Sequence, residues 1–235
     1  MSAGLSVRGL SAGYNGLVVV REASLDVAPG EVVTMLGPNG AGKTTTLLSI
    51  VGALRPMAGS ITFDGEDITK KGTDAISRLG LVLVPDSRGI FFDLTVKEHF
   101  RLAVAKGDKD GLDAILDRFS ALRPLLNRRA GLLSGGEQQM LALGKALVMK
   151  PKVLMIDEMS LGLAPLIVQS LMPIIRQAAE EDGMGVLLVE QHIEMALRFA
   201  DRGVVLNRGE IRFEGPASEL LANRDEVEAS YLART

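Results

Sequence analysis

Hydrophobic and polar residues alternate along the first quarter of the chain, which is the pattern of strands with one buried face. The alternation predicts strands at residues 5–10, 18–27, 31–36 and 60–63. From Gly42 onward the apolar residues recur at helical spacing, which predicts a helix over residues 45–54 that ends before Pro56. This helix follows directly on a glycine-rich stretch.

The middle of the chain is more polar and has helical spacing. Thr95 and Glu98 form a capping-box pattern at the start of one helix, and residues 113–119 carry apolar side chains at core spacing. We therefore expect a single domain, residues 1–235, in two lobes. A helical lobe over about residues 87–150 is inserted into a core lobe made of residues 1–86 and 151–235.

Two continuous apolar strands are predicted in the last third of the chain, at residues 153–157 and 186–190. A helix over residues 165–181 separates them, and another is expected over residues 192–200. Strands that are apolar on both faces and joined by a helix are typical of a buried parallel sheet. Residues 204–206 and 211–213, joined by Asn-Arg-Gly, predict a closing hairpin. The fold class that follows is α/β.

Composition narrows the function classes. The chain has 235 residues with 26 Lys and Arg against 29 Asp and Glu, a net charge of −3 that argues against broad neutralisation of nucleic-acid phosphates. A hydrophobic content of 47% excludes a disordered chain, and the lack of cysteine excludes disulfides and thiolate metal sites. No apolar stretch approaches the ~20 residues that span a bilayer. Because Met1–Leu10 lacks the pattern of a signal peptide, we expect the chain in the cytosol, with any membrane role exerted through a partner.

A glycine-rich segment lies between a predicted strand and a predicted helix, which is the context of a phosphate-binding loop. Its glycines allow backbone N–H groups to turn toward an anion, and the helix N-terminus adds positive potential. Lys43 would place a charge on the β- and γ-phosphates, and Thr44 would give its hydroxyl to Mg²⁺. The alternative is a glycine-rich turn without function. The nucleotide-binding residues that this segment predicts are Gly37, Pro38, Asn39, Gly40, Ala41, Gly42, Lys43, Thr44 and Thr45.

Two carboxylates follow the apolar strand at residues 153–157. The carboxyl ends of parallel strands are where such sheets bind ligands, so Asp157 is expected to be an outer-sphere or water-bridged Mg²⁺ partner. Glu158 is the candidate to polarise an attacking water. The alternative interpretation is a solvated acidic loop.

A third segment, Leu-Ser-Gly-Gly-Glu-Gln-Gln at residues 133–139, begins a helix and is called the signature segment below. Ser134 and Glu137 form a capping-box pattern, so helix initiation alone would account for them. Gly135 and Gly136 cost helix stability, which indicates that the backbone approaches something closely. An uncovered helix N-terminus of this kind suits an anion such as a γ-phosphate.

These three segments resemble the ATP-binding cassette (ABC) ATPases in order and spacing, over essentially the whole chain. The resemblance implies a P-loop NTPase fold of the ABC-ATPase type, with a mixed sheet core, an antiparallel β subdomain and an inserted helical subdomain. It implies Mg²⁺ and ATP, with Tyr14 stacked on adenine. It also implies two cassettes head to tail, so that Ser134, Gly135, Gly136 and Glu137 act on the nucleotide of the partner.

Several departures from the common cassette pattern narrow the subfamily. Asp86 stands where most cassettes have a glutamine that contacts Mg²⁺ and water, Ala164 replaces a loop aspartate, and Gln191 replaces the switch histidine. With the terminal Tyr-Leu pair at 231–232, these features resemble the smaller ATPase subunit of branched-chain amino-acid importers. The metal residues expected are Thr44, Asp157 and Asp86; the catalytic residues expected are Glu158, Lys43 and Gln191.

That resemblance implies partners as well: a second ABC ATPase subunit, identical or different, and two integral-membrane permease subunits. A periplasmic solute-binding protein is engaged indirectly, and no nucleic acid. The chain would lie at the cytoplasmic face of the inner membrane as a peripheral subunit. Four residues depart from the expected pattern. In these importers a proline is usual at Met159, a glycine at Ser87 and a proline at Phe92. An arginine is common in the signature helix at the position of Lys145.

The sequence also predicts positions for both histidines and for two phenylalanines. His192 adjoins the switch position and is expected at the surface or as a helix cap, with a switch role as the alternative. His99 is expected to be solvated. Phe91 or Phe92 is either ordinary core or the lining of a groove for a cytoplasmic helix of the permease.

Other functions stay open at this point. A cassette in DNA repair or translation would usually have a coiled-coil insert or a fused second cassette. A GTPase or small-molecule kinase would leave the signature segment unexplained. A nucleotide-gated scaffold with negligible turnover is consistent with the departures at Asp86, Ala164 and Gln191. Importers of urea, amides or other amino acids use similar cassettes, so the solute is not readable from this chain.

Overall fold

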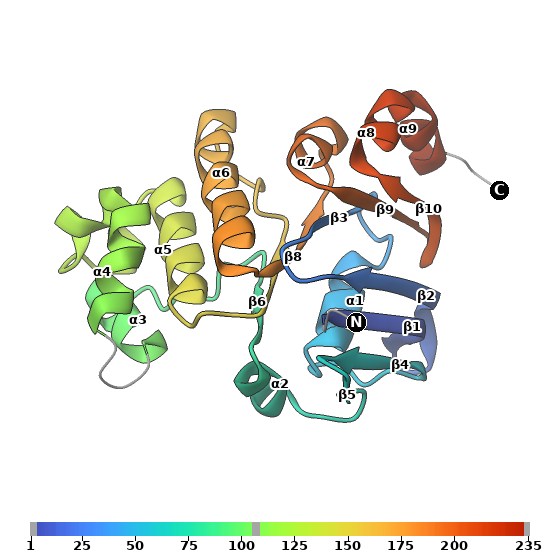
Figure 1. Cartoon of the computed structure of the whole chain (residues 1–235), viewed down its shortest axis with the longest axis horizontal. Coiled ribbons are helices and arrows are strands. Elements are labelled where there is room, and N and C mark those ends of the chain that lie inside the picture. The colour runs from blue at the N-terminus through green and yellow to red at the C-terminus, as the bar shows by residue number, and fades with distance from the viewer. Residues whose placement is uncertain (1–3, 105–108, 233–235) are drawn as a thin grey trace.

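The computed structural model describes residues 4–104 and 109–232. It contains a mixed sheet, a separate antiparallel sheet and helices, which confirms the predicted α/β class (Figure 1). Residues 1–3, 105–108 and 233–235, which the predicted lobes include, lie outside the described residues.

The antiparallel sheet is built mainly from the alternating segments near the N-terminus. Its strands run in the order β2-β1-β4-β5. Every second side chain of β1 is buried near its start, because one face of this sheet packs on the core. The strands are β1 (Leu5–Tyr14), β2 (Leu17–Val27), β4 (Ala58–Phe63) and β5 (Glu66–Asp67).

The mixed sheet has the order β10-β9-β3-β8-β7-β6. β7 pairs with β8 in parallel, as their sequences predict, and β9 and β10 form the predicted antiparallel hairpin. All side chains of β3, β7 and β8 are buried, because helices or the other sheet cover both faces. The strands are β3 (Val32–Leu36), β6 (Leu81–Val84), β7 (Val153–Asp157), β8 (Gly185–Glu190), β9 (Arg202–Asn207) and β10 (Glu210–Pro216).

The helices fall into groups around these sheets. Figure 1 shows α3, α4 and α5 together on one side of the molecule, and α7, α8 and α9 on the other. The helices are α1 (Lys43–Ile50), α2 (Thr73–Leu79), α3 (Val96–Ala103), α4 (Lys109–Arg118), α5 (Gly135–Leu147), α6 (Pro165–Asp182), α7 (Ile193–Phe199), α8 (Ala217–Ala222) and α9 (Arg224–Leu232). Two 3₁₀ helices, Ser120–Leu125 and Ala130–Leu132, connect α4 to α5.

The prediction that the helix after the glycine-rich segment reaches residue 54 is wrong. α1 ends at Ile50, because Gly52 adopts a φ of 71° in the left-handed region. The N–H groups of Ala53 and Leu54 fold back to the carbonyl of Leu48, which closes the helix end.

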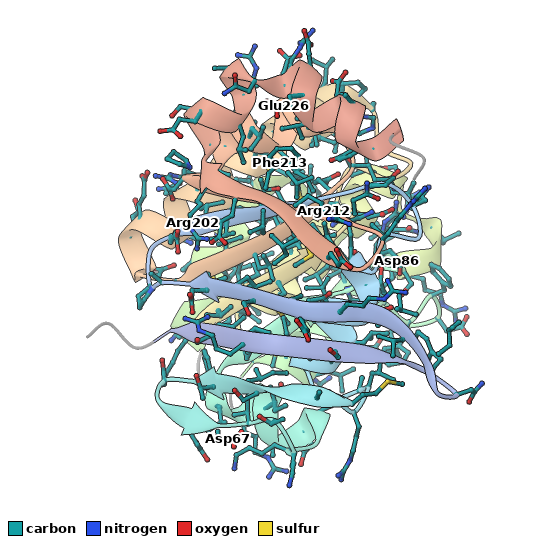
Figure 2. All side chains as sticks on the ribbon, turned by 90° about the vertical axis from the view of Figure 1, so that its right-hand side faces the viewer. Asp67, Asp86, Arg202, Arg212, Phe213 and Glu226 are labelled. Atoms are coloured by element: carbon teal, nitrogen blue, oxygen red, sulfur yellow. The ribbon has the colours of Figure 1, made fainter. Side chains whose placement is uncertain are left out.

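Two hydrophobic cores lie on opposite faces of the mixed sheet. Val33, Met35 and Leu187 pack toward the antiparallel sheet and α1. Their neighbours in sequence, such as Val32 and Leu188, pack toward the helices on the other face. A charged residue also ties the two sheets together: Arg202 on β9 donates to Glu31, 2.9 Å away, and to the carbonyl of Asp26 on β2, 2.6 Å away (Figure 2).

Candidate nucleotide site

The glycine-rich segment forms a tight loop between β3 and α1. A side chain at Gly37 would place its Cβ 2.3 Å from the carbonyl oxygen of Leu206, and one at Gly42 would lie 2.9 Å from Val20. Gly42 also has a φ of 107°, so both positions require glycine. No side chain caps α1, which leaves its first N–H groups available to an anion.

Lys43 lies inside this loop rather than in solvent. Its side chain is 4% exposed, and its ammonium donates to the carbonyls of Gly37 at 2.8 Å and Pro38 at 3.1 Å. The same Nζ lies 3.3 Å from Oε1 of Glu158. The lysine and the glutamate expected in catalysis are thus brought together by the ends of β3 and β7.

Thr44 and Asp157 form the adjacent polar pair. The Thr44 hydroxyl donates to Oδ2 of Asp157 at 2.8 Å. Oδ1 of Asp157 is buried and has no hydrogen-bond partner. Burial raises the pKa of Asp157, and the nearby carboxylates of Glu158 and Asp86 raise it further, while the hydrogen bond from Thr44 and the charge of Lys43 oppose the shift.

This pair fits Mg²⁺. Oxygen ligands are those that Mg²⁺ takes, and a nucleotide-bound ion needs only one or two from protein because phosphates and water supply the rest. No group of three or more His, Cys, Asp or Glu side chains could hold a metal within residues 4–104 and 109–232. The unpartnered Oδ1 of Asp157 is the buried acceptor that such a bound cation would satisfy.

Glu158 has a strained backbone. Its φ is 47°, in the left-handed region that disfavours residues with a side chain, and its N–H donates to the carbonyl of Val189 at 2.9 Å. A cavity of about 250 Å³ lies beside it. Gln191 and His192 line this cavity together with Glu158, so the predicted switch position and the predicted catalytic carboxylate lie beside the same cavity.

Tyr14 and Asp86 lie at exposed positions. Tyr14 ends β1 and is 46% exposed, which leaves a ring face available to a ligand. Asp86 follows β6, is exposed (labelled in Figure 2) and accepts a hydrogen bond from the N–H of Ser87 at 2.6 Å. Its effect on the pKa of Asp157 places it within electrostatic range of the Mg²⁺ residues.

The signature segment begins α5 with the predicted capping box. The N–H of Ser134 donates to Glu137 at 2.7 Å, and the N–H of Glu137 donates to the Ser134 hydroxyl at 3.3 Å. A Cβ at Gly136 would lie 3.1 Å from Ile167 on α6, so glycine allows α5 to approach α6 closely. Within the described part of the chain, no hydrogen bond or ion pair joins Ser134, Gly135, Gly136 or Glu137 to the phosphate loop.

Comparison with known proteins decides the family. The model of the family described as "ABC transporter" matches residues 20–160. The chain belongs to the ABC transporter family. It is 41% identical to the high-affinity branched-chain amino acid transport ATP-binding protein BraG of Pseudomonas aeruginosa, with 97% of this chain and 99% of that protein covered.

Two further comparisons agree. The chain is 37% identical to the probable branched-chain amino acid transport ATP-binding protein LivF of Archaeoglobus fulgidus, over 90% of this chain and 92% of that one. A solved structure of the ATP-binding subunit of an ABC transporter superposes with a TM-score of 0.85 at 28% identity, covering 98% of this chain and all of that one. The predicted ABC-ATPase fold and the predicted ATPase activity of the chain are thus confirmed.

One residue of this ABC cassette differs from its sequence expectation. His99 is 0% exposed, so the prediction that it is solvated is wrong. Its Nε2 accepts from the N–H of Phe91 at 2.9 Å, and its Nδ1 lies 2.8 Å from the carbonyl of Thr95, which fits a neutral ring protonated on Nδ1. The ring of Phe91 stacks on it with centroids 6.1 Å apart. The phenylalanines themselves are 61% and 60% exposed at 91 and 92, so they are not ordinary core.

Two connections around the site were not predicted. Arg88, with a φ of 64°, donates to the side chain of Gln138 at 2.7 Å and so links the loop after Asp86 to the signature helix. Glu190, the last residue of β8, accepts from Ser160. The sequence offered one signal for each connection. Arg88 is a cation in the loop after Asp86, and Glu190 is a carboxylate at the end of an apolar strand.

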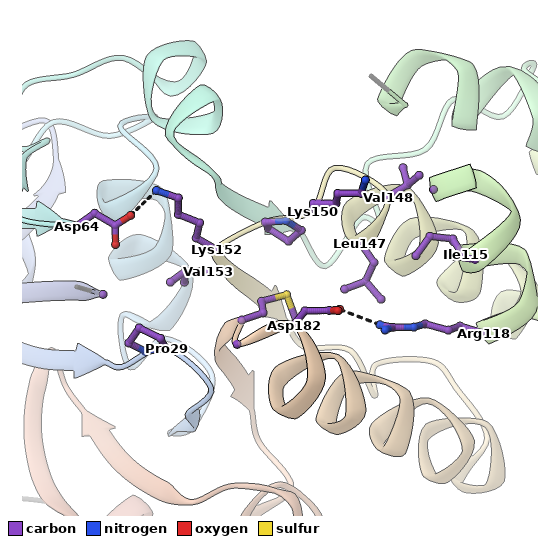
Figure 3. Close-up of a pocket in the computed structure, with 16 residues that line it drawn as sticks. Pro29, Asp64, Ile115, Arg118, Leu147, Val148, Lys150, Lys152, Val153 and Asp182 are labelled. Atoms are coloured by element: carbon purple, nitrogen blue, oxygen red, sulfur yellow. Dashed lines mark hydrogen bonds and ion pairs between the residues drawn. The ribbon is translucent and has the colours of Figure 1, made fainter. Parts of the chain in front are cut away.

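A larger cavity of about 650 Å³ lies away from the phosphate loop (Figure 3). Four of its charged side chains form ion pairs: Arg118 with Asp182 at 3.1 Å, and Lys152 with Asp64 at 2.6 Å. None of the predicted site residues lines it. The larger of these two cavities is therefore not the one that is lined by predicted catalytic residues of this cassette.

Proposed function

We propose that this chain is the ATP-hydrolysing subunit of an importer that moves branched-chain amino acids through a separate permease. One observation carries the hydrolytic part: an uncapped helix N-terminus, a buried lysine and two carboxylates meet at the carboxyl edge of the mixed sheet. The solute is supported by the printed functions of BraG and LivF, which are similar to this chain over nearly their whole lengths.

In the proposed reaction the loop amides and Lys43 bind the phosphates and stabilise the charge that develops on them. Glu158 orients the attacking water and accepts its proton, and Gln191 contacts the γ-phosphate side of the site. Thr44, Asp157 and Asp86 would hold Mg²⁺. The ion, when bound, neutralises phosphate charge and polarises the bond that breaks. Tyr14 packs on the adenine ring.

The assembly we propose contains two cassettes, identical or different, with Ser134, Gly135, Gly136 and Glu137 of each acting on the other's nucleotide. The exposed position of Ser134 at the start of α5 supports this, since the N-terminus of a helix favours an anion. Two integral-membrane permease subunits complete the transporter, and a periplasmic solute-binding protein delivers the solute; no nucleic acid takes part. The division into a core lobe and a helical lobe over about residues 87–150 belongs to the same proposal.

The cassette would bind the membrane from its cytoplasmic face. Over the described residues, the structure contains no helix with both the length and the apolar character needed to cross a bilayer. Phe91 and Phe92, each about 60% exposed beside the loop that carries Asp86, are proposed to line the groove for a cytoplasmic helix of the permease. Exposed aromatic side chains are suited to this, because they bury a large area on docking.

Proteoliposomes that contain the chain, its permease and its solute-binding protein test the proposal. We expect uptake of labelled leucine, isoleucine and valine that requires Mg-ATP on the cassette side and is lost in Glu158→Gln. Urea, acetamide and a sugar serve as comparison solutes. Uptake of urea or acetamide alone would contradict the assigned solute, whereas hydrolysis without uptake of any solute would contradict coupling to transport.

A further inference from the structure

Glu190 is a buried carboxylate that the proposed reaction does not use. It ends β8 and is 1% exposed, and no salt bridge joins it to a cation in the part of the chain that the structure describes. Its Oε1 accepts from the N–H of Ser160 at 3.0 Å, and its Oε2 accepts from the Ser160 hydroxyl at 2.6 Å. The backbone N–H of Gln191 also donates to it. Burial of an unpaired carboxylate is costly, so these three donors are what keep it in place.

The residue fastened by Glu190 lies two positions after Glu158. Glu158 itself is held by its N–H to the carbonyl of Val189, at 2.9 Å. Glu158, with its strained φ of 47°, is therefore fixed by two hydrogen bonds to consecutive residues of β8. Its own N–H bonds to Val189, and the N–H of Ser160 bonds to Glu190. A backbone in this region persists only where its surroundings fix it on both sides.

Apart from Met159, which is buried in the core, the loop beyond Glu158 has few other attachments. The N–H of Leu161 donates to the carbonyl of Glu158 at 3.1 Å and that of Leu163 to Ser160 at 3.2 Å, which are bonds within the loop. Leu161 is 56% exposed, and Gly162 has a φ of 71°. Ser160 is thus the residue whose hydrogen bonds tie the loop, called the 159–163 loop here, to the sheet.

We propose that Glu190 is a positioning residue for hydrolysis: through Ser160 it fixes the 159–163 loop, and with it the carboxylate of Glu158, in register with Gln191. Glu190, Ser160, Glu158 and Gln191 all line the same cavity of about 250 Å³, which puts the attachment beside the reacting groups. The inference rests on the proposed role of Glu158. Burial raises the pKa of Glu190, while its bonds from Ser160 and Gln191 oppose the shift, as expected for a carboxylate that is held without a cation.

Hydrogen exchange of the nucleotide-free protein tests the attachment without any reaction. In Glu190→Ala the amide of Ser160 loses its acceptor, and we expect the peptide that covers the 159–163 loop to exchange about tenfold faster. Thr34→Val is the matched control, because Thr34 is equally buried and donates to the carbonyl of Leu188 on the same strand, at 3.1 Å. Exchange of the loop that is unchanged in Glu190→Ala would overturn the proposal.

Steady-state hydrolysis then separates positioning from folding. We expect Glu190→Ala to lower kcat about tenfold or more while KM for ATP changes by less than about twofold, since the phosphate loop is untouched. Ser160→Ala should lower kcat by a smaller factor, and the double variant should be no slower than Glu190→Ala, because the two residues act as one unit. Glu190→Gln should restore most of the rate, since its amide can accept from the Ser160 N–H and donate to the hydroxyl.

Each other outcome counts against the inference. If kcat falls no further in Glu190→Ala than in Thr34→Val, Glu190 has only a structural role. Additive effects of Glu190→Ala and Ser160→Ala would have the same meaning. If Glu190→Ala does not fold, Ser160→Ala with unchanged kcat and unchanged loop exchange has the same meaning. Should Glu158→Gln keep wild-type hydrolysis, the proposed catalytic role fails, whereas the exchange result still reports on the attachment itself.

Discussion

Glu158→Gln is the substitution that tests the site most directly, because it keeps the shape of the side chain and removes its charge. Lys43 Nζ and Glu158 Oε1 are 3.3 Å apart, with side chains 4% and 15% exposed. At an effective dielectric constant of 20, two unit charges at that distance attract by about 5 kcal/mol, most of which is offset by desolvation. Lys43 keeps its two carbonyl partners in the variant, so we expect the fold to persist.

The expected effect on the reaction is much larger than that on the fold. Loss of a positioned base lowers kcat by about 10²- to 10⁴-fold. ATP affinity should rise, because a carboxylate that repels the γ-phosphate becomes a neutral amide. Light scattering of the purified variant with and without Mg-ATP gives its mass, hydrolysis is recorded in parallel, and Glu219→Gln on the exposed face of α8 serves as a control.

We expect the mass of Glu158→Gln to double only when Mg-ATP is present, as a composite site between two cassettes requires. A variant that binds ATP but stays monomeric would show that a different ATPase subunit or the permease completes the site. Hydrolysis within about threefold of wild type would refute the role of Glu158, and failure to bind ATP would refute the site as a whole.

Three further substitutions have outcomes that follow from local geometry. Gly37→Ala forces a Cβ to 2.3 Å from the carbonyl of Leu206, so ATP affinity measured by calorimetry should fall at least about tenfold; unchanged affinity would contradict the loop geometry. Tyr231→Phe removes a buried hydroxyl that has no partner, and should raise the free energy of unfolding by about 1–3 kcal/mol in denaturant titrations at pH 7. Burial raises the pKa of the Tyr231 hydroxyl, so the native state resists its ionisation; the gain from the substitution should therefore grow as the pH rises above about 10, and a constant gain would contradict this. Phe91→Ala should abolish transport while hydrolysis by the isolated chain persists, and intact transport and assembly would remove it from the proposed permease groove.

Features that depend on neighbours in sequence were predictable from the sequence. The strand alternation, the glycines of the phosphate loop and the capping box at Ser134 and Glu137 are all encoded within a few residues, and each is present. The end of α1 at Ile50 was missed because the apolar spacing continues past it, and only the left-handed conformation of Gly52 shows that the backbone has already turned.

Features that depend on distant residues were not predictable in the same way. His99 has an ordinary helical position, but it is buried: its Nε2 accepts from the N–H of Phe91, and the ring of Phe91 stacks on it. Glu190 and Ser160 are 30 residues apart, and they meet only because β7 and β8 are adjacent in the sheet. The predicted site residues from β3, β7 and β8 converge for that reason too, although the sequence gives no distance between them.

The backbone of Glu158 has a consequence for laboratory evolution of this chain. Asparagine and glycine adopt a φ of 47° at a lower conformational cost than glutamate does. Either substitution would relieve strain of order 1–3 kcal/mol and would remove the carboxylate. A screen for heat resistance alone should therefore enrich stable variants at position 158 that no longer turn over ATP. Stability and turnover thus place opposite demands on the residue at position 158. A selection that aims to improve both must keep this codon fixed and gain stability from other positions.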